Sequence, residues 1–299
     1  MAADSPGEKQ RPPLSSVIDL FKPGLAFSIL VTAVPGLLLG KTLPSAQTVF
    51  YCMLGTMLVA MSSFCYNQIL EMRTDALMKR TRKRVLADGS LSFTLVSLIA
   101  STMLIAGSGM LYLKVNSLAA LTAFSSFVIY VFIYTPLLKP RTEHNTVIGG
   151  LSGSIGPLIG EAAATGSLSL NGFALFLLMF LWQPPHFWAL AIRMKDDYAR
   201  AGLAMMPVVR GVPYTIKQML LYQILLLIAM ASLYVPLELG GLLYLIPSMS
   251  VGILVLAYMF KLRRTEDPGL AYRIFGLTIL HVVIWHAALG ADLYLRKFT

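Results

Sequence analysis

One short segment of this chain carries side chains whose types and spacing could do chemistry. Asn67, Glu71 and Asp75 follow one another at intervals of four residues. Four residues advance an α-helix by about 400°, so the three side chains would lie within about 80° of one another on one helical face. Two carboxylates at this spacing repel each other unless a cation lies between them, and ligands that are all oxygens suit a hard divalent ion. The row therefore predicts a magnesium site, with a phosphate group as the natural companion of the ion.

A run of basic residues follows this row directly. It comprises Lys79, Arg80, Arg82, Lys83 and Arg84. Guanidinium groups bind phosphate oxygens through paired hydrogen bonds, and Arg80 and Arg84 would share a helical face if the helix continued this far. Two plainer interpretations stay open at this point. The carboxylates could cap a helix end, and the basic run could be only the charged flank of a membrane span.

A second segment repeats this mixture of acids and bases. Residues 193–202 read RMKDDYARAG, which brings Arg193, Lys195, Asp196 and Asp197 together in sequence. Taken alone, such a loop is ordinary surface chemistry. Taken with the first row, it predicts a second edge of one metal and diphosphate site, at which two acids add ligands and two bases add positive charge.

A third segment, WQPPHFW at residues 182–188, lies inside an otherwise apolar stretch. Its two prolines remove backbone donors and predict a break in the helix. Trp182, His186 and Trp188 would then suit a flat ligand, with His186 as an axial iron ligand or a polar anchor. The alternative is that His186 is a packed, hydrogen-bonded core residue.

The elements that must position these groups are membrane helices. The 299 residues are 57% hydrophobic and only 13% charged, which excludes an ordinary soluble domain. The alternating pattern typical of a membrane barrel is absent, so we expect an all-α fold. Nine apolar stretches are long enough to cross a bilayer of about 30 Å. They cover residues 24–41, 46–70, 92–113, 117–138, 146–166, 171–192, 218–236, 241–260 and 272–294.

The positive charges predict the orientation of these spans. Of the 24 Lys and Arg residues, 20 fall on the side that carries residues 71–91, 139–145 and 193–217. Only four lie on the other side: Lys41, Lys114, Arg296 and Lys297. The positive-inside rule therefore places the N-terminus in the cytoplasm and the C-terminus outside. Topology and phosphate contacts account for the net charge of +10, and we expect no binding of nucleic acid.

No linker divides the apolar part of the sequence. We therefore expect a single membrane domain, residues 16–299, surrounded by membrane lipid. Residues 1–15 form a polar tail that has neither the apolar core of a signal peptide nor the Arg-rich, acid-poor composition of a transit peptide. A bacterial inner membrane is the expected location.

These segments resemble those of a known family, the UbiA-type intramembrane prenyltransferases. The resemblance covers FKPGLAF at residues 21–27, the polar row with its continuation DALMKRTRKR at 75–84, and YTPLLKPRTEHNTVIGGLSGSIGPLIG at 134–160. WQPPHFWALAIRMKDDYARAGLAMMP at 182–207 is the most discriminating block, and it is similar to that of the haem-modifying branch, the haem O synthases. The chain departs from that branch at Arg73, where an acid is usual.

The resemblance implies transfer of a farnesyl group from farnesyl diphosphate to a vinyl group of haem B, with addition of water, to give haem O for terminal oxidases. It also implies a role for each candidate residue. The residues that would hold magnesium on the diphosphate are Asn67, Glu71, Asp75, Asp196 and Asp197. Those that would neutralise the leaving group are Lys79, Arg80, Arg84, Arg193 and Lys195. His186 would contact the haem, with Trp182 and Trp188 beside it.

The resemblance also makes a haem A synthase or another oxidase-assembly enzyme a candidate partner. Two other functions stay open. One is a UbiA-type enzyme for a different aromatic acceptor, such as a quinone precursor. The other is a transporter of an anionic lipid or phosphate, which would more often carry polar residues at the bilayer midplane and show two matched halves. The charges of this chain gather at one membrane face, which favours an enzyme.

Overall fold

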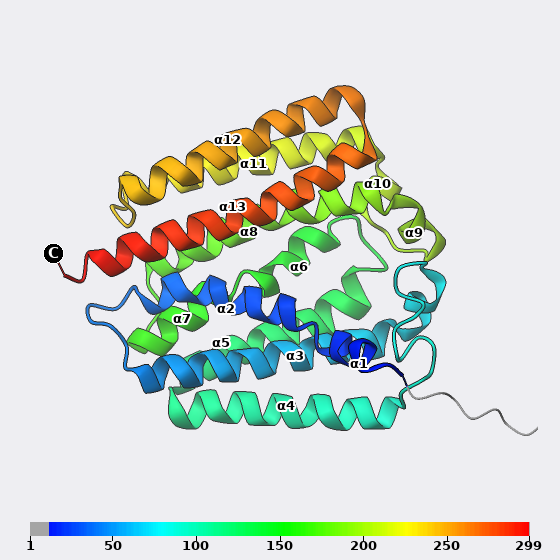
Figure 1. Ribbon diagram of the computed structural model, residues 1–299, viewed down its shortest axis with the longest axis horizontal. Helices are drawn as coiled ribbons and strands as arrows, with labels where there is room; N and C mark the ends of the chain where they lie inside the picture. The colour runs from blue at the N-terminus through cyan, green and yellow to red at the C-terminus, as the bar shows by residue number, and fades with distance from the viewer. Residues whose placement is uncertain (1–11, 299) are drawn as a thin grey trace, which may run out of the picture.

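The computed structural model describes residues 12–298 and shows a bundle whose long helices lie roughly side by side (Figure 1). Within these residues there is no β-strand, and nine helical spans are long and apolar enough to cross a membrane. The predicted all-α fold with nine spans is therefore confirmed. The spans are Leu14–Leu37, Ala46–Leu77, Phe93–Lys114, Ser117–Leu138, Asn145–Thr165, Leu170–Arg193, Val212–Tyr234, Leu242–Thr265 and Pro268–Leu295.

Three of these spans are not single regular helices, which the apolar pattern does not reveal. The first consists of α1 (Leu14–Phe21) and α2 (Pro23–Leu37), which meet at Lys22, and the fourth runs from α5 (Ser117–Val128) into a π-helix, η1 (Ile129–Leu138). The fifth consists of α6 (Asn145–Gly153) and α7 (Gly156–Thr165). The other helices are α3 (Ala46–Leu77), α4 (Phe93–Lys114), α8 (Leu170–Arg193), α9 (Lys195–Arg200), α10 (Met206–Val209), α11 (Val212–Tyr234), α12 (Leu242–Thr265) and α13 (Pro268–Leu295).

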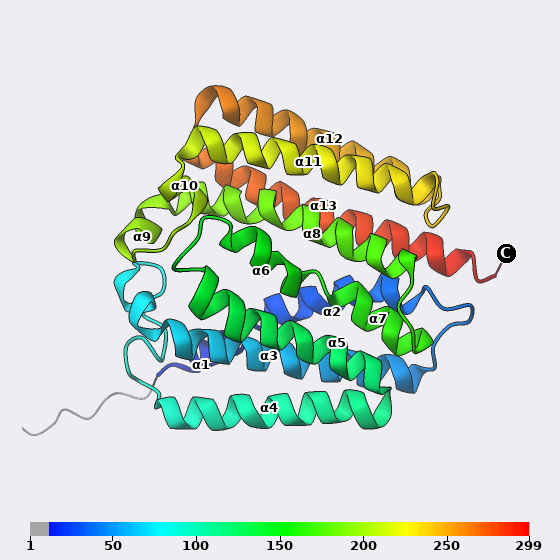
Figure 2. The ribbon, with the colours of Figure 1, turned by 180° about the vertical axis from the view of Figure 1, so that it is seen from behind.

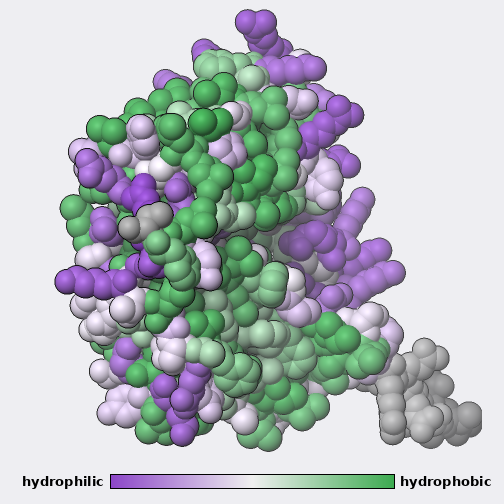
Figure 3. All heavy atoms as spheres, turned by 60° about the vertical axis from the view of Figure 1, so that its left-hand side comes forward, coloured by the Kyte–Doolittle hydropathy of each residue, from purple (hydrophilic) through white to green (hydrophobic). Residues whose placement is uncertain are grey.

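The two longest connections between spans, residues 78–92 and 194–211, lie at one end of the bundle, which we call the loop end (Figure 2). It also carries residues 139–144, and the C-terminus lies at the opposite end (Figure 2). Hydrophobic side chains cover most of the face between the two ends (Figure 3). Placement of the loop end in the cytoplasm stays a prediction. The predicted tail, residues 1–15, lies outside the described residues as far as residue 11, and α1 begins at Leu14.

The prolines of the third segment do not break their helix, contrary to our expectation. Helix α8 continues through Pro184 and Pro185, and both are buried. Gln183 donates from its amide nitrogen to the carbonyl of Gly150 at 3.0 Å and to the hydroxyl of Ser154 at 2.6 Å, which fastens α8 to α6 at this point. Membrane helices tolerate proline where neighbouring helices supply such support.

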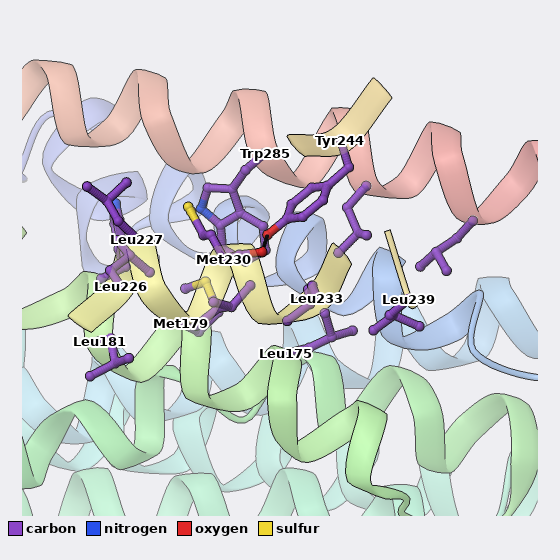
Figure 4. Close-up of a cluster of buried hydrophobic side chains, with 14 residues drawn as sticks. Leu175, Met179, Leu181, Leu226, Leu227, Met230, Leu233, Leu239, Tyr244 and Trp285 are labelled. Carbon is purple, nitrogen blue, oxygen red and sulfur yellow. Dashed lines mark hydrogen bonds between the residues drawn. The ribbon is translucent and has the colours of Figure 1, made fainter. Parts of the chain in front are cut away.

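A cluster of buried apolar side chains joins α8, α11, α12 and α13 (Figure 4). Trp285 and Tyr244 are its largest fully buried members. The tyrosine hydroxyl donates to the carbonyl of Met230 at 3.2 Å, so its polar atom is satisfied inside the membrane span. Packing of this kind holds α8 and α13 in register with each other.

Helices α2 and α7 approach each other so closely that only glycine fits between them. A Cβ atom added to Gly160 would lie 2.1 Å from the carbonyl oxygen of Ala33, and one added to Gly36 would lie 1.9 Å from that of Pro157. Small residues that allow this approach are a common way to join membrane helices. The contact fixes α2 against the centre of the bundle.

We expect Gly160→Ala to destabilise the protein by about 1 to 3 kcal/mol, because backbone atoms must move to admit the methyl group. Thermal unfolding in detergent measures the effect. Gly109→Ala is the matched control: Gly109 lies in α4 and a Cβ there meets nothing within 4 Å. An equal loss of stability in both variants would contradict this explanation.

Candidate active site

The predicted polar row lies on the last turns of α3 and faces the interior. Asn67, Glu71 and Asp75 are 2%, 7% and 1% exposed. Helix α3 has 32 residues, more than the roughly 20 needed to cross a bilayer, so its polar end reaches the loop end of the bundle. The four-residue spacing does place the three side chains on one buried face. Polar groups buried at the end of a membrane helix are costly and tend to mark function.

The chain turns back after Leu77 and brings Arg84 onto Asp75. Arg84 Nη1 donates to Asp75 Oδ2 at 2.6 Å, and the Thr81 hydroxyl donates to the Asp75 carbonyl oxygen at 2.9 Å. Asp75 Oδ1 is buried and has no hydrogen-bond partner among residues 12–298. A desolvated carboxylate oxygen without a partner is unfavourable, so this atom indicates a position for a cation or a donor.

Glu71 forms an ion pair with Lys139, which comes from the connection after η1. Both side chains are largely buried. Burial alone disfavours the charged ammonium, but the nearby Glu71 carboxylate outweighs this and raises the pKa of Lys139 above its ordinary value. Lys139 therefore stays charged at neutral pH. It was not among the predicted site residues.

The π-helix η1 supplies further groups to this site. The hydroxyl of Thr135 donates to the carbonyl of Tyr130, five residues earlier, at 2.8 Å and accepts from Asn67 Nδ2 at 3.2 Å. The wider turn changes the direction of the side chains that follow, and π-turns are frequent at functional sites. Pro136 inside an apolar span was the one sequence signal for this irregularity.

Aromatic rings line the site beside the polar row. Tyr130 stacks on Tyr134 with ring centroids 5.6 Å apart, and Phe64 meets Tyr130 edge to face at 6.1 Å. The ammonium of Lys22 lies 5.3 Å from the centroid of Phe64. Sequence reasoning did not select these rings, because they come from two helices that are far apart in sequence.

The second acid and base segment lies beside the first but adds no carboxylate to the polar row. Asp196 and Arg193 are exposed, Lys195 is half-buried, and Asp197 is paired with Arg200. Within residues 12–298 no three His, Cys, Asp or Glu side chains come close enough to hold a metal ion.

The two loops nevertheless contact each other. Met78 packs against Leu203 and Met205 in one buried cluster, and Asn145 donates to the carbonyl of Ala204 at 3.0 Å. Tyr198, on α9, lies near enough to Lys139 to contribute to its raised pKa. The two loops therefore form one surface at the loop end.

Most of the basic run lies outside the site. Helix α3 ends at Leu77, so Arg80 and Arg84 do not share a helical face. Lys79 and Arg80 are exposed, and only Arg84 turns inward onto the polar row.

His186 is held between two aromatic rings. Trp182 stacks on one face and Phe275 on the other, each with centroids 4.4 Å away. Nδ1 lies 2.8 Å from the Thr278 hydroxyl, and the Trp182 indole donates to the Thr278 carbonyl at 2.8 Å. Trp188 lies apart from this group, fully buried against Tyr222 of α11.

The sequence matches the UbiA prenyltransferase family over residues 29–285. It is 40% identical to the protoheme IX farnesyltransferase of Leptospira biflexa over 274 residues, which are 91% of this chain and 96% of that one. It is also 40% identical to the protein of that name from Alcanivorax borkumensis, with 92% of each chain covered.

Solved structures share the fold. The bundle matches that of a digeranylgeranylglyceryl phosphate synthase with a TM-score of 0.76, 16% identity and coverage of 94% of this chain and 98% of the other. It matches a UbiA homologue from Archaeoglobus fulgidus, bound to DMAPP and Mg²⁺, with a TM-score of 0.67, 17% identity and coverage of 91% and 98%. The family match over residues 29–285 and the 40% identity to relatives along nine-tenths of the chain show that the chain belongs to the UbiA prenyltransferase family.

Proposed function

We propose that this protein transfers the farnesyl group of farnesyl diphosphate to a vinyl group of haem B, with addition of water, to make haem O for terminal oxidases. The observation that carries the choice of substrates is the 40% identity, over nine-tenths of the chain, to proteins named protoheme IX farnesyltransferase. The buried polar row supports the prenyl diphosphate half of the reaction. The proposed setting is a bacterial inner membrane, with the loop end in the cytoplasm and a haem A synthase or oxidase-assembly enzyme as a candidate partner.

The residues present fit magnesium bound to a diphosphate. Asp75 Oδ1 is a buried carboxylate oxygen with no partner in the described chain, and Asn67 and Glu71 add oxygens on the same face. A magnesium ion held there would stabilise the negative charge of the departing diphosphate. We keep Asp196 and Asp197 as proposed further ligands, because they share α9 with Tyr198, which lies close to Lys139.

The cations of the site would neutralise the remaining negative charge of the leaving diphosphate. Arg84 and Lys139 are fixed by their ion pairs at the polar row, so they stabilise charge without reorganising during the reaction. Lys79, Arg80, Arg193 and Lys195 lie farther out, and we propose that they attract the diphosphate to the loop end.

The aromatic rings would protect the reacting carbon. When the bond between C1 of the farnesyl group and the diphosphate breaks, its electron pair leaves with the diphosphate and positive charge develops on the allyl group. Phe64, Tyr130 and Tyr134 offer ring faces to that charge and exclude water from it. The electron-rich vinyl group then forms the new carbon–carbon bond. Water adds to the resulting cation and loses a proton.

The test is direct. Protein purified in detergent is given haem B, farnesyl diphosphate and magnesium, and the haem is analysed by chromatography and mass. We expect a more hydrophobic haem, heavier by one farnesyl group plus one water, that disappears when any component is omitted. Release of diphosphate with a different aromatic acceptor, but no new haem, would place the protein with the quinone-directed enzymes instead.

The proposed contact of His186 with haem B, the acceptor of the farnesyl group, can be tested by mutation. We expect His186→Ala to weaken binding of haem B by about tenfold or more and binding of farnesyl diphosphate much less, as measured by separate titrations. The imidazole, held by Thr278 and two rings, is a preorganised group, and its loss leaves a gap beside the proposed haem position. Trp182, which stacks on the imidazole, remains a proposed neighbour of the haem, whereas Trp188 packs against Tyr222 and would act only through the packing of α8.

The control is His281→Ala, which removes another buried histidine, hydrogen-bonded to the Ser248 carbonyl at 3.0 Å. That change should leave the ratio of the two affinities unaltered. If His186→Ala weakens both ligands equally, the residue only supports the fold.

A further inference from the structure

Lys22 occupies a strained position at the joint between α1 and α2. Its φ of 45° and ψ of 58° lie in the left-handed region, and the next residue is Pro23. A residue with a side chain rarely adopts this conformation, and a following proline favours extended backbone instead. Strain of this kind persists where the surroundings enforce it, and it clusters at ligand sites.

The ammonium of Lys22 lies over a ring of α3, three residues before the polar row begins. This ring is that of Phe64, and the charge of Lys22 is attracted by the carboxylates of Glu71 and Asp75 and repelled by Arg84 and Lys139. The side chain thus belongs to the same cluster of charges, although it comes from a different helix and lies 49 residues from Glu71 in sequence.

The three cations of this cluster, Lys22, Arg84 and Lys139, differ in whether they have an ion-pair partner. Arg84 is paired with Asp75, and Lys139 is paired with Glu71. The ammonium of Lys22 has no ion pair or hydrogen bond with any of residues 12–298, and it lies over the ring of Phe64. It can therefore bind a ligand without giving up a partner.

The balance of charge indicates the type of ligand. With Lys22 protonated, two carboxylates and three cations leave one positive charge in excess, and the two carboxylates are buried. An unpaired cation in such a place is unfavourable, and an anionic oxygen group relieves that cost. The Phe64 ring limits the movement of the ammonium, so the charge is already in position.

We propose that Lys22 is the substrate-binding cation of this site, and that it binds an anionic oxygen group of a substrate. The proposal rests on the proposed function, which offers two such groups: the diphosphate of the donor and the carboxylates of haem B. Both are oxygen anions, and separate binding measurements distinguish them.

The experiment uses the full-length protein in detergent and measures binding of inorganic diphosphate, haem B and haem B dimethyl ester, each alone. Lys22→Met keeps the length of the side chain and removes its charge. We expect a loss of about tenfold to a hundredfold in affinity for one ligand, the size typical of a charge-assisted hydrogen bond. Loss for inorganic diphosphate identifies the donor. Loss for haem B, with the dimethyl ester unaffected, identifies the haem carboxylates.

Three further variants make the result decisive. Lys22→Arg keeps the charge and should retain most of the affinity, whereas Phe64→Leu removes the ring and should weaken the same ligand by a few-fold. Lys41→Met, at the opposite end of the bundle, should change nothing.

If no ligand loses more than twofold in folded Lys22→Met, or if Lys22→Arg behaves like Lys22→Met, the proposal is wrong. Binding is measured without turnover. A wild-type protein that makes no haem O would therefore overturn the proposed function and leave the Lys22 result readable.

Discussion

Replacement of Asp75 by alanine is expected to abolish turnover and to leave the protein folded. Asp75 offers the one buried carboxylate oxygen of the polar row that has no partner in the described chain. Loss of a metal ligand at the point where charge develops should lower kcat by about a thousandfold or more, which corresponds to about 4 kcal/mol of transition-state stabilisation. The fold should survive, because Thr81 binds the main-chain carbonyl of Asp75 and not its side chain, and because Arg84, which loses its partner, is half-buried and can turn to water.

The measurement combines haem O formation with thermal unfolding in the same detergent. Asp75→Asn keeps the shape of the side chain and can still accept from Arg84, so an inactive but fully stable Asp75→Asn would isolate the role of the charge. Asp88→Ala is the matched control, because Asp88 is an exposed acid of the same loop whose carboxylate accepts only from the Ser90 amide. Full activity in Asp75→Ala would rule out this site as the diphosphate and metal site.

Local spacing made the polar row predictable. Residues four apart share a face in any helix. The long apolar run around Asn67 predicts that this segment is a helix, so the spacing could be applied to it. The same logic identified the nine spans. It could not identify η1, because a π-helix has the same apolar composition as the α-helix that it continues.

The partners of the row were not predictable, because they come from other helices. Lys139 is 68 residues from Glu71, and Lys22 is 49 residues from it. Both stood in the sequence as ordinary basic residues at the ends of spans, where topology alone explains positive charge. Only the packing of η1 and α2 against α3 brings them to the carboxylates.

Prolines misled the sequence analysis for a related reason. A Pro-Pro pair removes two backbone donors, and in isolation it ends a helix. In α8 the pair is buried, and Gln183 binds α6 just before it. Tertiary contacts therefore maintain a helix that local preference would end. Of the two tryptophans predicted to lie beside the haem with His186, Trp182 stacks on the imidazole and Trp188 packs against Tyr222.

The ion pair between Glu71 and Lys139 leads to the second large effect. We expect Lys139→Met to lower both stability and turnover, because it leaves the Glu71 carboxylate buried without its cation. Breaking a buried pair from one side typically costs about 3 to 5 kcal/mol. The double variant Glu71→Gln/Lys139→Met removes both charges, and it should recover most of the lost stability.

Among the Lys139→Met and Glu71→Gln/Lys139→Met variants, we expect stability to recover in the double variant and turnover to stay low. If Glu71 helps to hold magnesium and Lys139 stabilises the leaving group, the double variant regains its melting temperature but stays inactive. The control is the exposed pair of Arg210 with Glu143, 3.0 Å apart at the loop end, for which Arg210→Met should change neither quantity appreciably. A double variant that regains full turnover would mean that the pair serves only the fold. In that case Glu71 and Lys139 would have no part in the chemistry, and the proposed site would have to be moved.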